Sequence, residues 1–174
     1  MNDPITLSSS TIARMPRSRF IAQAGMIAAL YAAATLICML LLQGLAWGPV
    51  QFRISEAICV VAVLTPAAIP GLTVGCIIAN LVNMAISGTG ALGLLDVVFG
   101  STATLIGAAL CWKLRERPAL AIGCFVAANA LIVPAYLPMY LFGVVATGIG
   151  EALVIYVLGL PLLEALKRFV PRND

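Results

Sequence analysis

The stretch FIAQAGMIAALYAAATLICMLLLQ, residues 20–43, decides the fold because it contains no charged side chain. An α-helix needs about 20 mainly apolar residues to cross the hydrocarbon layer of a membrane. Arg14, Arg17 and Arg19 precede the stretch, and no small-residue cleavage site leads into a polar mature region. We therefore expect a retained transmembrane helix, with residues 1–18 as a short cytoplasmic tail.

The rest of the chain has the same apolar character. Of its 174 residues, 62% are hydrophobic and 10% are charged, whereas soluble domains carry about 25% charged residues. Five further apolar segments follow, at about 50–66, 70–86, 94–112, 119–141 and 144–166. We predict an all-α integral membrane protein, a bundle of six transmembrane helices that forms one domain over residues 19–170.

The basic residues indicate the orientation of this bundle. Nine of the ten gather before the first segment, between the fourth and fifth, and after the sixth. They are Arg14, Arg17, Arg19, Lys113, Arg115, Arg117, Lys167, Arg168 and Arg172. With six spans these three regions lie on one side of the membrane. Because Lys and Arg are enriched in cytoplasmic loops, we expect both termini to be cytoplasmic.

Four ionisable residues, Arg53, Glu56, Asp96 and Glu151, lie inside or at the edge of apolar segments. A charge at the bilayer centre costs about 2.5–3.5 kcal/mol, so such residues usually serve a function. Structural alternatives remain: Arg53 can pair with Glu56 three residues on, Asp96 can cap a helix, and Glu151 can pair with Arg53. The predicted topology places all four toward the extracellular side, in an acid-rich pocket closed inward by apolar packing.

Amide and aromatic side chains extend this candidate site. Asn80, Asn83 and Asn129 both donate and accept hydrogen bonds, as recognition of a heterocycle requires, although hydrogen bonding between helices is an equally open alternative. Trp47 suits stacking on a planar ligand, but Trp is also common in the aromatic belt at a membrane interface.

Small residues recur every four positions in the first segment, at Ala24, Ala28 and Ala32. Such a stripe lets another helix approach closely. Two interpretations follow, namely packing within the bundle or a docking face for a partner membrane protein.

Several classes of chemistry are excluded. The chain has no histidine, no Gly-rich phosphate loop and no Walker lysine, and its five cysteines show no CxxC spacing. We expect buried, reduced cysteines and no enzyme activity, catalytic residue, metal site, cofactor or nucleic-acid partner. Any energy for transport must then come from an ion gradient or a separate ATPase.

Residues 47–57, WGPVQFRISEA, resemble the signature of the QueT family of queuosine-precursor transporters. The resemblance continues through residues 70–80 and 95–105, and more loosely through Ala128-Asn129-Ala130 and the start of the sixth segment. It implies a substrate-binding (S) component of an energy-coupling factor (ECF) transporter. The candidate substrate-binding residues are Arg53, Glu56, Asp96, Glu151, Asn80, Asn83, Asn129, Trp47 and Gln51.

The resemblance also implies partners and a location. The expected substrate is a 7-deazaguanine precursor of queuine. The expected partners are membrane lipid, a transmembrane coupling protein (EcfT) and two cytoplasmic ATPases. The expected location is the plasma membrane of a bacterium. Members of this fold dock the coupling protein through an AxxxA stripe, which Ala24–Ala28 fits. The alternative is a stand-alone ion-coupled secondary transporter of a small polar solute, which would use the buried acids as cation sites. Many such transporters are built from inverted repeats, and this sequence shows none.

Overall fold

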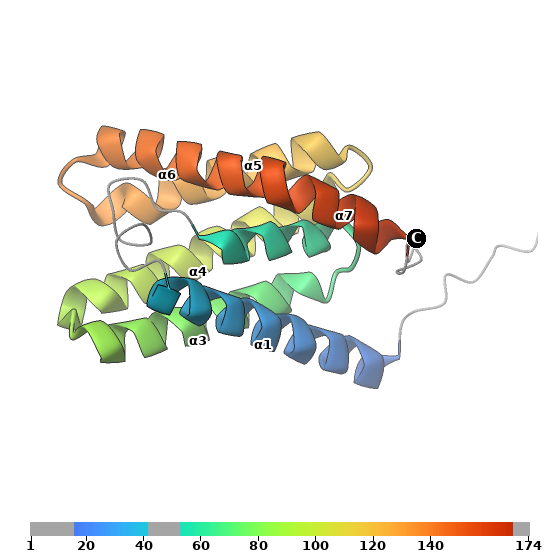
Figure 1. Cartoon of the computed structure of the whole chain (residues 1–174), viewed down its shortest axis with the longest axis horizontal. Helices are drawn as coiled ribbons and strands as arrows, with labels where there is room; N and C mark the ends of the chain where they lie inside the picture. The colour runs from blue at the N-terminus through green and yellow to red at the C-terminus, as the bar shows by residue number, and fades with distance from the viewer. Residues whose placement is uncertain (1–15, 42–52, 169–174) are drawn as a thin grey trace, which may run out of the picture.

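The computed structural model describes residues 16–41 and 53–168. These residues are mainly helical, with short turns between the helices and no strand among them, which confirms the predicted all-α fold (Figure 1). The elements are α1 (Arg17–Leu41), η1 (Ile54–Val63), α3 (Ala68–Ser87), α4 (Gly90–Lys113), α5 (Pro118–Ile132), η2 (Val133–Tyr136), α6 (Tyr140–Val154), η3 (Ile155–Gly159) and α7 (Leu160–Lys167). Trp47 and Gln51, and most of the predicted tail over residues 1–18, lie outside the described residues.

Five of the described helices are long and apolar enough to cross a membrane. They are α1, α3, α4, the continuous run Pro118–Tyr136 and the continuous run Tyr140–Lys167. The predicted fifth helix extends too far, since the chain leaves helical geometry after Tyr136 and begins α6 at Tyr140. Pro138 falls in this break, and proline lacks the N–H that a continuing helix needs.

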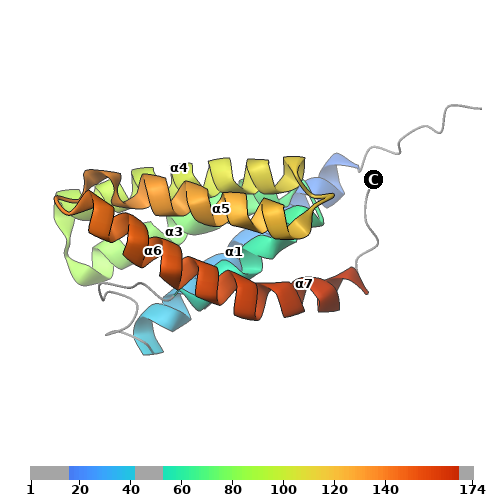
Figure 2. The same cartoon turned by 90° about the horizontal axis from the view of Figure 1, so that it is seen from above.

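The predicted second helix is a ten-residue 3₁₀-helix, η1. It contacts α1, α3, α4, α5, α6, η3 and α7, so it lies in the middle of the bundle. Figures 1 and 2 both show it enclosed by the longer helices. A 3₁₀-helix rises about 2.0 Å per residue, and runs longer than about four residues are uncommon. Packing against the surrounding helices therefore stabilises η1, which is longer than most 3₁₀-helices.

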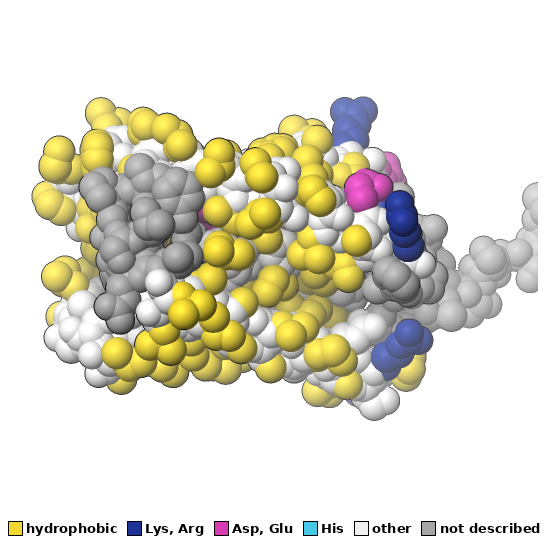
Figure 3. All heavy atoms as spheres, viewed as in Figure 1, with side chains coloured by type: hydrophobic (Ala, Val, Ile, Leu, Met, Phe, Trp, Pro, Cys, Tyr) yellow, Lys and Arg dark blue, Asp and Glu magenta, His cyan; other side chains and the backbone are white. Residues whose placement is uncertain are grey.

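The two ends of the bundle differ in charge. The basic end, defined by the exposed residues Arg17, Lys113, Arg117 and Lys167, is seen at the right in Figure 3. The opposite end, called the far end here, holds the C-terminus of α1, the α3–α4 turn and the α5–α6 turn. Between them, large hydrophobic side chains such as Met26, Leu105, Phe142 and Ile149 are exposed along the sides, as expected of a surface that faces lipid.

The described hydrophobic core fills the half of the bundle nearer the basic end. Phe125 and Ile122 of α5, Leu72 of α3 and Leu163 of α7 are almost fully buried in it. A Cβ on Gly107 of α4 would lie 2.8 Å from Cδ2 of Phe125. Closely apposed small and large residues thus seal this half, in line with the expected apolar closure.

Helices α1 and α3 pack closely through the predicted small-residue stripe. A Cβ on Gly71 would lie 2.8 Å from the carbonyl oxygen of Ala24, and one on Gly75 would lie 2.8 Å from that of Ala28. Ala28 and Ala32 are each only 6% exposed. The structure therefore supports the internal-packing interpretation, and the stripe is not a free docking face along its length. The exposed small residues of α1 include Gly25, Ala29 and Ala33 instead.

Candidate functional site

A small polar cavity lies where η1 meets α3, α4, α5 and α6. Its volume is about 20 Å³, and it is lined by Arg53, Glu56, Cys76, Gly100, Thr104, Asn129, Val133, Thr147 and Glu151. This is room for about one water molecule, whereas sites for small organic ligands usually measure about 300 Å³ or more. The cavity must widen before it holds a ligand of that size.

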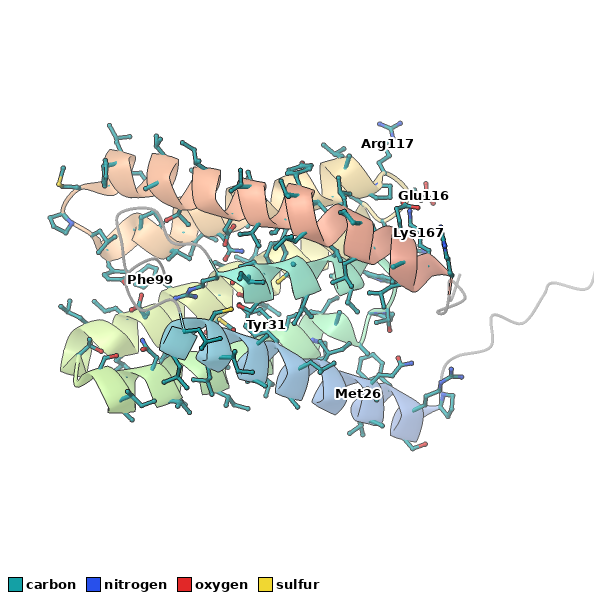
Figure 4. The ribbon with its side chains drawn as sticks, viewed as in Figure 1. Met26, Tyr31, Phe99, Glu116, Arg117 and Lys167 are labelled. Atoms are coloured by element: carbon teal, nitrogen blue, oxygen red, sulfur yellow. The ribbon has the colours of Figure 1, made fainter. Side chains whose placement is uncertain are left out.

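The cavity lies near the middle of the bundle, deeper than the sequence suggested. Glu151 follows the start of α6 at Tyr140 by 11 residues, which is about 16 Å at the rise of an α-helix. Tyr31, which contacts Glu56, lies at the centre of α1 (Figure 4). About three turns of α6 therefore lie between Glu151 and the far end of the bundle.

Glu56 is tied into the bundle through both of its carboxylate oxygens. The hydroxyl of Tyr31 on α1 donates to Oε1 at 2.6 Å, and the thiol of Cys59 donates to Oε2 at 3.2 Å. Glu56 is 3% exposed and Tyr31 is 1% exposed. Because Cys59 lies three residues after Glu56 on the same 3₁₀-helix, the winding of η1 places the thiol beside the carboxylate.

Other polar atoms around the cavity have no partner. Nε of Arg53, Nδ2 of Asn129 and Oε2 of Glu151 are buried, and no atom of the described residues forms a hydrogen bond with them. The alternative that Arg53 and Glu56 form an ion pair is wrong, since no nitrogen of Arg53 lies within 4.0 Å of a carboxylate oxygen of Glu56 in the described structure. Since buried polar groups in native proteins are nearly always paired, this group of unpaired atoms is the unusual feature of the site.

Asp96 lies to one side of the cavity. Helix α4 begins at Gly90 after the N-cap Thr89, so the alternative role of Asp96 as a helix cap is wrong. Its carboxylate accepts a hydrogen bond from the hydroxyl of Tyr136, whose ring lies 5.5 Å from that of Phe99. Figure 4 shows Phe99 toward the far end, at the left.

The asparagines of α3 occupy two different places. The Nδ2 atom of Asn80 lies 3.4 Å from Sγ of Cys76, and it would lie 3.0 Å from a Cβ on Gly100. Asn80 therefore borders the cavity through two of its lining residues, but Asn83 does not. Oδ1 of Asn83 accepts a hydrogen bond from Ser87 at 3.0 Å and faces an apolar groove between α1 and α3.

Sequence reasoning missed Tyr31, Cys59, Cys76, Thr104 and Thr147. A signal existed for Tyr31, the only tyrosine within the apolar residues 20–43. The two cysteines were expected to be inert and buried; they are buried and free, yet Cys59 donates to Glu56 and Cys76 lines the cavity. The threonines carry no signal, because threonine is common in membrane helices.

Apolar helices around a buried polar cavity define a multi-pass membrane protein with an internal polar site. The chain belongs to the QueT transporter family, whose family model matches residues 21–168. This confirms the resemblance seen in residues 47–57 and makes the protein a member of a transporter family. Comparison with curated proteins and with solved structures gave no match.

Proposed function

We propose that this protein is the substrate-binding (S) component of an ECF importer and that it takes up a queuosine precursor, a 7-deazaguanine derivative. The observation that carries the proposal is the set of unpaired buried atoms on Arg53, Asn129 and Glu151 around one cavity in a chain of the QueT transporter family. A buried atom without a partner costs free energy that a ligand can return by pairing with it.

The chemistry of a 7-deazaguanine suits these groups. Its N1–H and 2-amino group lie side by side, so one carboxylate accepts both hydrogen bonds. Its 6-oxo group accepts a hydrogen bond from an amide or a guanidinium, which Asn129 and Arg53 can supply. A second acidic group suits the ammonium of an aminomethyl substituent. Two carboxylates, Glu56 and Glu151, line the cavity.

We further propose that the bundle crosses the membrane six times with the basic end in the cytoplasm. Helix η1 supplies the second crossing. It is too short to face lipid alone, but non-α backbone is tolerated within membranes where protein surrounds it, and most residues of η1 are buried. Ligand would then approach from the extracellular far end and find the basic-end core closed.

The coupling protein needs a membrane-embedded surface near the cytoplasm. An apolar groove of about 290 Å³ lies between α1 and α3 in the basic-end half, lined by Phe20, Ile21, Ala24, Gly25, Ala28, Pro70 and Val74. Ala24 and Ala28 of the AxxxA stripe therefore border this groove, while Ala32 does not. We propose that a transmembrane helix of the coupling protein occupies it.

Equilibrium binding to the purified protein tests the substrate assignment. We expect 7-aminomethyl-7-deazaguanine or its 7-cyano analogue to bind, while riboflavin, thiamine and biotin do not. Preferential binding of one of those vitamins would contradict the assignment. Uptake measured with and without the coupling ATPases separates the two transport mechanisms, because an ion-coupled carrier continues to work without them.

A further inference from the structure

The two carboxylates that line the cavity are bonded differently. Glu56 receives a donor on each oxygen, from Tyr31 at 2.6 Å and Cys59 at 3.2 Å. Glu151 receives none from the described residues, and its Oε2 is buried without a partner. Both side chains are buried, at 3% and 8% exposure respectively, so solvent does not explain the difference.

The free carboxylate has free donors around it. Nδ2 of Asn129 on α5 and Nε of Arg53 at the start of η1 are also buried and unpaired, and both residues line the same cavity. The residues that line the cavity thus present one unused acceptor, on Glu151, together with two unused donors, and Oδ1 of Asn80 at its border is a further unpaired acceptor. A planar edge on which an N–H stands beside a C=O, such as a lactam, complements an acceptor–donor pair.

The backbone around Glu151 is also unusual. Four residues after it, the helix widens into the π-helical segment η3, and π-helical turns occur frequently at functional sites. Gly159 of η3 lies against η1, since a Cβ there would be 2.7 Å from Cγ1 of Val60. The continuous helical run Tyr140–Lys167, which carries Glu151, therefore packs against η1, which contains Glu56 and follows Arg53.

We propose that Glu151 is the carboxylate that contacts the substrate, with Asn129 as its neighbouring donor, and that Glu56 is a positioning residue fixed to α1. The inference rests on the proposed function and deepens it. It assigns recognition of the N1–H and 2-amino edge to Glu151 and recognition of the 6-oxo group to Asn129.

Binding of two probes to three proteins tests the assignment. The probes are 7-deazaguanine and 7-deazahypoxanthine, which lacks the 2-amino group. We expect the unmodified protein to prefer 7-deazaguanine by roughly tenfold or more, because losing the amino group leaves an acceptor unpaired. Glu151→Gln should reduce this preference to near one, whereas Glu56→Gln should weaken both probes together and keep the preference. A preference lost in Glu56→Gln and kept in Glu151→Gln would overturn the proposal.

Thermal unfolding of the ligand-free protein in detergent gives a second readout that needs no substrate. Glu151→Met removes an unpaired acceptor and should raise Tm by about 2–4 °C. Glu56→Met deprives Tyr31 and Cys59 of their acceptor and should lower Tm by a similar amount. Equal lowering by both variants would contradict the assignment.

The two experiments fail in distinguishable ways. If the unmodified protein binds neither probe, the proposed substrate is wrong, and the opposite signs of the two Tm changes still decide which carboxylate is free. If it binds 7-deazaguanine but Glu151→Gln keeps the preference for the 2-amino group, the substrate assignment stands and the role of Glu151 falls.

Discussion

The basic-end half of the bundle and its middle are built on opposite principles. Near the basic end, Leu72, Phe125 and Leu163 are buried among apolar neighbours. In the middle, single polar atoms of Arg53, Asn129 and Glu151 are buried and unpaired. The first arrangement stabilises the fold, and the second lowers stability while leaving groups free for a ligand. Proteins commonly show this trade-off between stability and function.

Among these variants, Phe125→Ala is expected to lower stability the most, and it tests the packing near the basic end. Phe125 is 1% exposed and packs against Gly107, so the variant leaves a cavity that should lower the free energy of unfolding by about 3 kcal/mol. Unfolding in a denaturing detergent measures the loss. Leu120→Ala on the same helix is the control, since Leu120 is 50% exposed and should tolerate the change. An equal loss for both variants would show that the half near the basic end is not specially packed.

Tyr31→Phe tests how firmly the middle is held. The variant keeps the ring but removes the donor to Glu56, and a buried acceptor that loses its partner costs about 1–3 kcal/mol. Affinity for 7-deazaguanine should fall together with stability. Tyr156→Phe removes a hydroxyl that donates to the carbonyl of Ala119, far from the cavity, and should leave affinity unchanged.

Gly75→Ala tests the contact that joins the middle to α1. The added Cβ would lie 2.8 Å from the carbonyl oxygen of Ala28 and 3.2 Å from Cβ of Tyr31, so α1 must shift. We expect a loss of about 1–3 kcal/mol in stability. Gly25→Ala is the matched control on α1, because a Cβ there meets nothing within 4 Å and alanine favours a helix. Equal stability of the two variants would argue against close α1–α3 packing.

The smallest expected effect is that of Tyr136→Phe. Tyr136 donates to Asp96, and neither residue lines the cavity. Affinity for 7-deazaguanine should change by less than about 1 kcal/mol, the value of a typical hydrogen bond. A loss as large as that of Tyr31→Phe would place Asp96 in the substrate site and extend the polar region toward the far end.

Polarity within apolar segments made part of the site predictable. Arg53, Glu56, Asn129 and Glu151 stood out in the sequence because each is costly in lipid, and the structure brings these four residues to one cavity. The clustering of basic residues at one end was also predictable, because Lys and Arg are enriched in the loops on one side of the membrane.

The faces of the helices were not predictable. In a soluble protein, apolar periodicity shows which side of a helix is buried, but here lipid is as apolar as the core. The sequence therefore gave no reason to place Asn80 beside the cavity and Asn83 in a separate groove. Nor did it show that Ala28 and Ala32 are buried while Ala29 and Ala33 are exposed.

The 3₁₀ winding of η1 determines how far apart this segment holds its two ends. Ten residues of 3₁₀-helix extend about 20 Å, whereas the same residues wound as an α-helix extend about 15 Å. An α-helix of the same residues would thus hold Arg53 about 5 Å closer to Leu64. Because Arg53 lines the cavity and Leu64 belongs to the core near the basic end, the winding of this one segment determines the distance between the two regions.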